Sequence, residues 1–236
     1  MTESLGAPTG ASAAPFAPQA IVFDMDGLLL DTERIALATF EDACRRHDVV
    51  VERAVYERCI GTSVQGTRAI MEEVLGVDVY ERVGREWFQL YEARVLTQAV
   101  DLKVGARELL DLTKRVGVPM ALATSTATAI AKTKLALAGL DSYFVAIVGG
   151  DAVMRAKPDP ESYLTAARSL GVSAQRCWAV EDSDNGVRAA HAAGFFVFQV
   201  PDLVQPSADV RRLGHHVVVT LHDVAELLRR HHGGGL

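Results

Sequence analysis

Short apolar runs alternate with helix-like segments through the second half of the 236-residue chain, and this alternation most constrains its fold. The runs are too short for helices and predict buried strands at residues 119–124, 144–148, 177–180, 196–200 and 217–219. The helix-like segments occupy residues 106–116, 128–137, 159–170, 185–193 and 221–230. Strands and helices in this order form a parallel sheet that helices cover on both faces.

A first strand-like run, residues 20–23, stands apart from the others. Residues 33–102 follow it and show helical spacing with no strand pattern. The sequence therefore predicts an α/β fold, with a Rossmann-like parallel-sheet core at residues 20–32 and 103–228 and an inserted all-helical cap at residues 33–102. The position of the cap directly after the first strand favours a lid over a site, and a second small bundle is the alternative.

The first cap helix has Thr32 as a candidate N-cap. Further cap helices are predicted at residues 52–59, 64–75 and 78–97. Residues 1–19 are rich in Ala, Pro, Gly and Ser and lack the basic start and apolar stretch of an export signal, so they predict a disordered tail. Residues 229–236 predict a frayed helix end followed by a flexible glycine tail.

The composition excludes several classes of protein. The net charge of −6 indicates no basic face for nucleic acid or a membrane surface, and no stretch approaches the roughly 18 apolar residues of a membrane span. Cys44, Cys59 and Cys177 are odd in number and far apart, which predicts neither a disulfide framework nor a zinc site. A cytoplasmic protein is expected, and the sequence indicates no protein partner.

Two carboxylates stand at the end of the first predicted strand. Asp24 and Asp26 are two residues apart, Gly27 follows them, and Asp31 comes four residues later. The spacing brings the first two carboxylates to the same side of the chain, where they repel each other unless a cation, a shared proton or water relieves them. An Asp-rich turn without chemistry is the alternative interpretation.

A second acidic pair, Glu181 and Asp182, ends the strand predicted at residues 177–180. Because ligands of an open parallel sheet gather at the carboxyl ends of its strands, we expect this pair near Asp24. Carboxylate oxygens suit a hard cation such as Mg²⁺. Asp184 is instead expected in the first turn of the following helix, where it faces the positive end of the helix dipole.

Hydroxyl and basic side chains complete the set. Thr124, Ser125 and Thr126 lie between a strand and a helix, where they can bind phosphate, although helix capping by Ser125 or Thr126 is the alternative. Lys157 precedes Pro-Asp-Pro at a helix start and is a candidate phosphate cation. Arg155 is the rival candidate, and a solvated surface lysine is the alternative without function.

These four segments, in this order, resemble the motifs of the haloacid dehalogenase-like hydrolases. The stretch Phe-Asp-Met-Asp-Gly-Leu-Leu-Leu-Asp-Thr-Glu is especially similar to the β-phosphoglucomutase-like and sugar-phosphate phosphatase subgroup, whose helical cap follows the first motif. The resemblance covers about residues 20–224. It implies a Mg²⁺-dependent phosphatase that hydrolyses a small phosphorylated metabolite (a sugar, polyol or nucleotide phosphate) through an aspartyl-phosphate intermediate.

The resemblance also implies a role for each site residue. Asp24 would be the nucleophile and Asp26 the general acid and base. The phosphate-binding residues would be Thr124, Ser125 and Lys157. The metal ligands would be the Asp24 side chain, the Asp26 backbone carbonyl, Asp182 and, directly or through water, Glu181. In the cap, Gly61, Thr62 and Ser63 are expected to reach towards the site, and a loop that only joins two cap helices is the alternative.

Other activities of similar proteins are disfavoured by single residues. A haloacid dehalogenase would not need Asp26, and phosphonate hydrolysis would need a cap lysine, which is absent between Thr32 and Leu102. A β-phosphoglucomutase would carry a histidine at the position of Ala36. From a different class, a receiver-type phosphoacceptor module would need neither Asp26 nor a seventy-residue helical insertion. Mutase and receiver module remain the alternatives to the phosphatase.

Overall fold

The computed structural model describes residues 15–62 and 64–232. Six parallel strands form one sheet in the order β3-β2-β1-β4-β5-β6. The strands are β1 (Ala20–Phe23), β2 (Met120–Ala123), β3 (Ala146–Val148), β4 (Cys177–Glu181), β5 (Phe196–Gln199) and β6 (His216–Val217). The sheet confirms the predicted Rossmann-like α/β fold.

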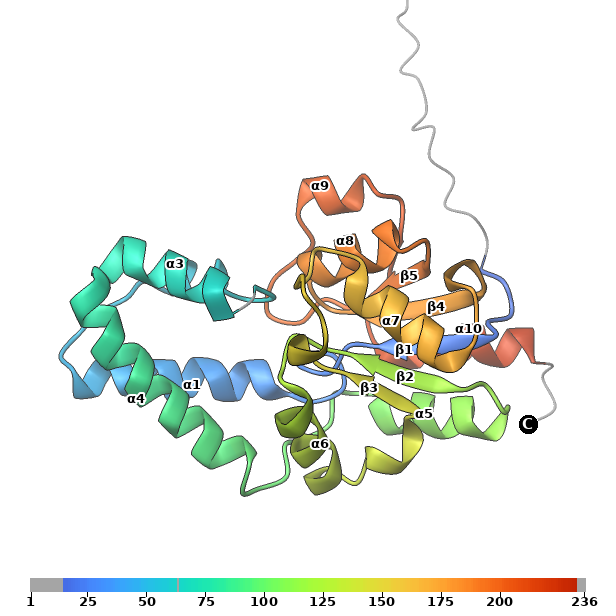
Figure 1. Ribbon diagram of the computed structural model, residues 1–236, viewed down its shortest axis with the longest axis horizontal. Helices are drawn as coiled ribbons and strands as arrows, with labels where there is room; N and C mark the ends of the chain where they lie inside the picture. The colour runs from blue at the N-terminus through green and yellow to red at the C-terminus, as the bar shows by residue number, and fades with distance from the viewer. Residues whose placement is uncertain (1–14, 63, 233–236) are drawn as a thin grey trace, which may run out of the picture.

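Helices cover both faces of this sheet (Figure 1). They are α5 (Ala106–Arg115), α6 (Thr128–Leu137), α7 (Glu161–Leu170), α8 (Asp184–Ala192), α9 (Ala208–Arg211) and α10 (Leu221–His231). Side chains of β1 alternate between the two faces: Ile21 and Phe23 join the hydrophobic cluster with α5, α6 and α10, whereas Ala20 and Val22 join the cluster with α7 and α8. All four β1 side chains are buried, as a central parallel strand requires.

Strand β1 lies at the centre of the sheet, paired with β2 on one side and with β4 on the other. Its last residue, Phe23, is opposite Leu122 of β2 and Val180 of β4. The carboxyl ends of three neighbouring strands therefore meet at one edge of the sheet. The residues that follow these strands, Asp24, Thr124 and Asp182, are brought together by this register.

The described residues of the inserted segment form four helices, and Figure 1 shows this cap beside the core at the left. They are α1 (Thr32–Arg46), α2 (Arg53–Glu57), α3 (Val64–Leu75) and α4 (Val77–Val95). The cap has its own apolar core, in which the rings of Phe40, Tyr56 and Trp87 contact one another at centroid distances of 5.0–5.9 Å. The two chain segments that join cap and core run side by side, since the Asp31 N–H donates to the Asp101 carbonyl at 2.8 Å.

Three local expectations differ from the structure. Asp31, not Thr32, is the N-cap residue of α1, because the helix already begins at Thr32, directly after the residue whose N–H pairs with the Asp101 carbonyl. Residues 15–19 were expected in the tail, but Phe16 packs edge-on against Phe196 at 5.7 Å and the Gln19 N–H donates to Arg176. Helix α10 continues to His231 instead of fraying at Arg229.

The remaining parts of both tail predictions, residues 1–14 and 233–236, lie outside the described residues. Among the helices of the described chain, none combines the length and apolar character that a bilayer crossing would need.

Candidate active site

Asp24 lies directly beyond β1, with its N–H bonded to the Val180 carbonyl of β4. Its side chain is buried, and Oδ1 accepts a hydrogen bond from Lys157 Nζ at 2.6 Å. Burial raises the pKa of this carboxyl to about 7, because the attraction of Lys157 is opposed by the charges of Glu181 and Asp26. The strand pairing thus holds a carboxylate with a fixed orientation in a dry environment.

Asp24, Glu181 and Asp182 form an acidic cluster in which one oxygen from each side chain lies within 4.8 Å of the others. Burial raises the pKa of Asp182 well above its ordinary value, and the charges of Glu181 and Asp24 raise it further. Like charges buried this close are unfavourable unless a cation neutralises them. The donor set therefore fits a hard divalent cation bound by oxygen ligands.

Gly27 makes room for this cluster. Its φ angle of +79° belongs to the left-handed region, and a Cβ atom at this position would lie 2.4 Å from Oδ2 of Asp182. A side chain here would both strain the backbone and displace the carboxylate. The glycine in the first acidic segment is therefore needed for the close approach of Asp182.

Glu181 is fully buried, and both of its oxygens are engaged by the protein. Oε1 accepts from Lys157 Nζ at 2.5 Å and from the Tyr163 hydroxyl at 2.9 Å. Oε2 accepts from the N–H groups of Asp182 and Ser183 and from the Ser183 hydroxyl, each at 3.1 Å. These five bonds suit a residue that orients the loop and neutralises Lys157. Direct metal ligation by Glu181, which the sequence left open against ligation through water, would have to displace some of them.

Lys157 is buried and uses its ammonium group for three hydrogen bonds, to Asp24, to Glu181 and to the Ala123 carbonyl at 2.9 Å. Burial alone would lower the pKa of this amine, but the two carboxylates raise it above its ordinary value. Arg155, the rival phosphate cation, is exposed and pairs with Asp159 at 3.0 Å. The structure therefore places Lys157, and not Arg155, in the cluster.

Thr124 is buried beyond β2, and its hydroxyl oxygen accepts the N–H of Thr126 at 3.1 Å. Ser125 is exposed beside it. The alternative that Ser125 or Thr126 caps α6 is wrong, because Asp151 does so: its Oδ1 accepts the N–H and the hydroxyl of Thr128 at 2.8 and 2.6 Å. The hydroxyl residues after β2 are thus not used by the helix start.

Asp26 is held at both oxygens. Oδ1 accepts from Lys134 Nζ at 2.8 Å, and Oδ2 accepts from the Thr126 hydroxyl at 2.6 Å. Burial would raise the pKa of this carboxyl, but the charge of Lys134 and the hydrogen bonds from Lys134 and Thr126 outweigh burial and lower it. Two aspartates two residues apart therefore have opposite pKa shifts.

Sequence reasoning missed three residues near this site: Glu33, Lys134 and Tyr91. Glu33 lies in the first turn of α1, and burial raises its pKa to about 7, with the charges of Asp26, Asp202 and Asp24 adding to the effect. The burial of Lys134 could have been predicted from the sequence, because this residue stands three residues after Ala131 and next to Leu135 on the apolar side of a predicted helix. A lysine at such a position needs a buried partner.

The cap touches the core beside Asp182. The Gly61 carbonyl accepts from Asn185 Nδ2 at 2.9 Å, and a Cβ atom at Gly61 would lie 2.6 Å from the Ser183 Cβ. Thr62 instead turns back into the cap, with its hydroxyl donating to the Cys59 carbonyl at 2.7 Å. Ser63 lies outside the described residues.

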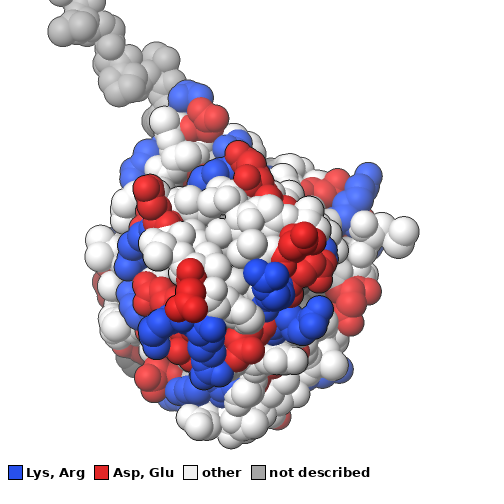
Figure 2. Space-filling view, turned by 90° about the vertical axis from the view of Figure 1, so that its left-hand side faces the viewer, with Lys and Arg blue, Asp and Glu red and all other residues white. Residues whose placement is uncertain are grey.

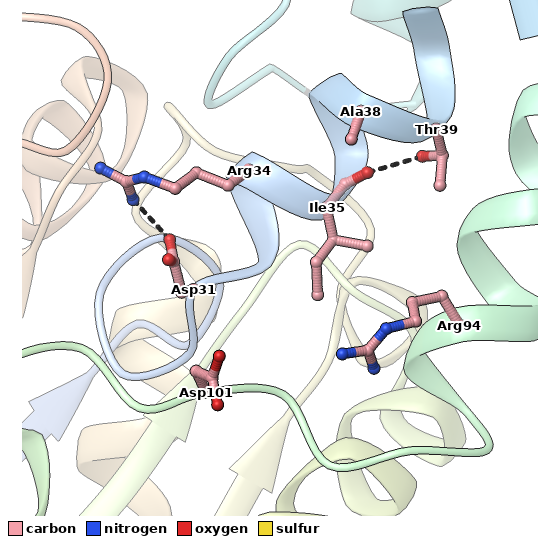
Figure 3. Close-up of a pocket in the computed structure, with 7 residues that line it drawn as sticks. All are labelled: Asp31, Arg34, Ile35, Ala38, Thr39, Arg94 and Asp101. Atoms are coloured by element: carbon pink, nitrogen blue, oxygen red, sulfur yellow. Dashed lines mark hydrogen bonds and ion pairs between the residues drawn. The ribbon is translucent and has the colours of Figure 1, made fainter. Parts of the chain in front are cut away.

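A separate pocket of about 440 Å³ lies between the start of α1 and the end of α4. In Figure 3, Ile35 and Arg94 point into it, and Arg34 pairs with Asp31 at its edge. None of its lining residues belongs to the acidic cluster. This pocket follows the joint between cap and core and is distinct from the acidic site.

Comparison with known proteins agrees with this geometry. A family model described as haloacid dehalogenase-like hydrolase matches residues 21–200. A phosphorylated carbohydrates phosphatase of Thermotoga maritima is 32% identical over 181 residues, which cover 75% of this chain and 82% of that protein. Hexitol phosphatase A of Escherichia coli is 29% identical over 209 residues, covering 87% and 91% respectively.

Among solved structures, a HAD family hydrolase of Deinococcus radiodurans, crystallised with phosphate and sodium, superposes with a TM-score of 0.76 at 26% identity. The superposition covers 91% of this chain and 97% of that one. The sheet order, the helical insertion and the acidic strand ends are thus accounted for together: the chain belongs to the haloacid dehalogenase-like hydrolases and is an enzyme whose curated relatives include named phosphatases.

Proposed function

We propose that this enzyme is a Mg²⁺-dependent phosphatase that hydrolyses a small phosphomonoester through an aspartyl phosphate on Asp24. One observation carries the proposal: the buried Asp24 carboxylate is fixed by Lys157 at Oδ1, inside an acidic cluster that suits a divalent cation. A carboxylate nucleophile divides the hydrolysis of an inert ester into two easier steps.

In the first step an Asp24 oxygen forms a bond to phosphorus while the bond from phosphorus to the leaving alkoxide breaks. The protonated form of Asp26, a minor species in the free enzyme because Lys134 lowers its pKa, gives its proton to that alkoxide oxygen. In the second step water attacks the phosphorus of the aspartyl phosphate and passes a proton to Asp26. Phosphate leaves, and both aspartates return to their starting states.

Mg²⁺ would be held by the carboxylates of Asp24 and Asp182 and by the backbone carbonyl of Asp26. When bound, it supplies positive charge between an anionic nucleophile and an anionic ester. Glu181, with five protein donors on its carboxylate, would act mainly by orienting Lys157 and the loop that carries Asp182.

Phosphate binding is assigned to Thr124, Ser125 and Lys157. Thr124 and Ser125 follow β2 at the same sheet edge as Asp24, and the Lys157 ammonium lies between Asp24 and Glu181. Fixed donors at the phosphate oxygens stabilise the charge that develops during transfer.

The substrate class we propose is a small phosphorylated sugar or polyol, with a nucleotide phosphate as the third possibility. The relatives' names, a phosphorylated carbohydrates phosphatase and a hexitol phosphatase, support the first two. The contact of Gly61 with the loop of Ser183 and Asn185 supports a cap that closes the site and admits small molecules only. The mutase alternative is disfavoured by one residue, because the Ala36 side chain offers no group for proton transfer and its carbonyl accepts the Trp87 N–H.

The test is phosphate release from a panel of sugar, polyol and nucleotide phosphates, with a phosphoserine protein as the large substrate. Turnover of a small phosphate should require Mg²⁺, stop with EDTA and return when Mg²⁺ is restored. The phosphoserine protein should be a poor substrate. Undiminished turnover without metal would refute the metal assignment, and equal turnover of the phosphoprotein would refute the closing cap.

A further inference from the structure

Lys134 is a buried lysine that none of the four sequence segments contains. It lies on α6 with a side-chain exposure of 1%. Its ammonium donates to Oδ1 of Asp26 and to the hydroxyl of Tyr91, each at 2.8 Å. The same ammonium lies 5.0 Å from the centre of the Tyr91 ring.

The burial of Lys134 points to a specific partner. A charged amine out of water is strongly unfavourable unless a close counter-charge and hydrogen bonds compensate it. Asp26 supplies the charge, and the Tyr91 hydroxyl supplies a second acceptor. The lysine is therefore built into the environment of Asp26.

Lys134 also connects the core of the molecule to the cap. Asp26 belongs to the core loop after β1, and Tyr91 belongs to cap helix α4. One ammonium group joins them through two hydrogen bonds. A cap displaced from the core would separate Tyr91 from Lys134 and leave the ammonium group with one hydrogen-bond partner fewer.

Each of the two aspartates thus has its own lysine. Lys157 holds Asp24 at 2.6 Å, and Lys134 holds Asp26 at 2.8 Å. The remaining oxygen of Asp26 is fixed by the Thr126 hydroxyl, so the carboxylate is clamped from both sides. Such a clamp sets where the carboxyl group points, which decides whether it reaches the leaving oxygen of a substrate.

We propose that Lys134 is the positioning residue for Asp26 in the phosphatase reaction proposed above, and that Tyr91 links this positioning to the cap. When Asp26 has given its proton to the leaving alkoxide, the resulting carboxylate is met by the Lys134 ammonium. When water later returns a proton to Asp26, the clamp holds the same carboxyl group in place.

The experiment compares Lys134→Met, which keeps length and removes charge, with Lys134→Arg and with Lys132→Met as the matched control. Lys132 is exposed on the same helix. Two substrates are used with Mg²⁺: a sugar phosphate, whose alkoxide needs protonation, and p-nitrophenyl phosphate, whose leaving group does not. Help from a general acid is typically worth about 10²–10⁴-fold.

Lys134→Met should lower kcat/KM, which reports the phosphoryl-transfer step alone, by about 10²-fold for the sugar phosphate and by less than about tenfold for p-nitrophenyl phosphate. Lys134→Arg should recover much of the loss, and Lys132→Met should be unaffected. Adding Lys134→Met to Asp26→Asn should cost little more than Asp26→Asn alone, because both act through one carboxyl group.

Equal losses of kcat/KM for the two substrates, or losses that multiply with Asp26→Asn, would overturn the role of Lys134. If Lys134→Met does not fold, Tyr91→Phe decides by the same substrate comparison: a larger loss for the sugar phosphate supports the link, and equal effects refute it. Absence of turnover in the wild-type enzyme would instead refute the proposed function.

Discussion

The core site and the cap surface use charge in opposite ways. In the core, Asp24, Lys134 and Lys157 are held by short contacts out of water. On the cap, arginines and glutamates pair in the open, as in Arg46 with Glu86 at 2.7 Å, and Figure 2 shows basic and acidic side chains intermingled on this face. Loss of a partner is costly in the first setting and nearly free in the second.

This difference indicates which positions of the chain tolerate substitution. Each charged residue of the core site depends on a buried partner. A substitution of one of them therefore leaves another charge without its partner. The cap surface is free to change, and the cap reaches the site region through contacts such as those of Gly61 and Tyr91. The cap is therefore the part that we expect to define the substrate.

The largest effect on kcat is expected for Asp24→Asn, because this change removes the proposed nucleophile from the core site. An amide is a poor nucleophile for phosphorus, and removal of the nucleophile from a covalent mechanism costs roughly 10⁴-fold or more in kcat. Phosphate release from the best substrate of the panel measures the loss, with circular dichroism as the control for folding. A variant within tenfold of the wild type would show that the nucleophile is another group.

The effect of Mg²⁺ on stability is expected to be intermediate and to depend on pH. Folding without metal raises the pKa of Asp24 from 3.8 to about 7. The folded state then binds more protons than the unfolded state between these values, so the contribution of Asp24 to the stability of the metal-free protein is lost as the pH rises through about 7. A cation offsets the repulsion, and protons compete with it at lower pH.

Differential scanning calorimetry at pH 6 and pH 8, with and without Mg²⁺, measures this effect. At 100 times Kd the cation should stabilise the protein by about 2.7 kcal/mol, a rise in Tm of roughly 5–10 °C for a chain of this size. At a fixed Mg²⁺ concentration the rise should be larger at pH 8. A larger rise at pH 6 would contradict the acidic cluster as the binding site.

The smallest effect is expected on the cap surface. Arg58 pairs with Glu73 at 2.8 Å, and both side chains are about half exposed or more. Arg58→Gln should change the free energy of unfolding by less than about 1 kcal/mol and leave kcat unchanged. Urea unfolding and the phosphatase assay measure the two quantities. A loss of activity comparable to that of a core variant would break the contrast between the two regions.

The fold could be predicted because strand and helix periods are local. Most predicted elements agree with the structure within two residues, as for α6 at Thr128–Leu137. Helix α9 (Ala208–Arg211) was not predicted, since four residues carry no readable period. The strand ends that carry Asp24 and Asp182 could be recognised because each follows an apolar run.

The rest of the site depends on contacts between distant segments. Lys134 and Asp26 are 108 residues apart, and Lys134 and Tyr91 are 43 residues apart, so no spacing in the sequence relates them. For the contact of Gly61 with Asn185, the sequence predicted only that the loop reaches towards the site, and not which residue it meets. Packing of the cap against the core decides these pairs, and that packing is not encoded in any short segment.

The most direct test of the account is to identify the phosphorylated residue. The wild-type enzyme is mixed with its best sugar phosphate and Mg²⁺, quenched in acid within the first turnover, digested and analysed by mass spectrometry, with Asp24→Asn as the control. We predict a phosphoryl group on the peptide that contains Asp24, absent from the variant. Turnover with no phosphorylated peptide, or with the phosphoryl group on another residue, would contradict Asp24 as the nucleophile.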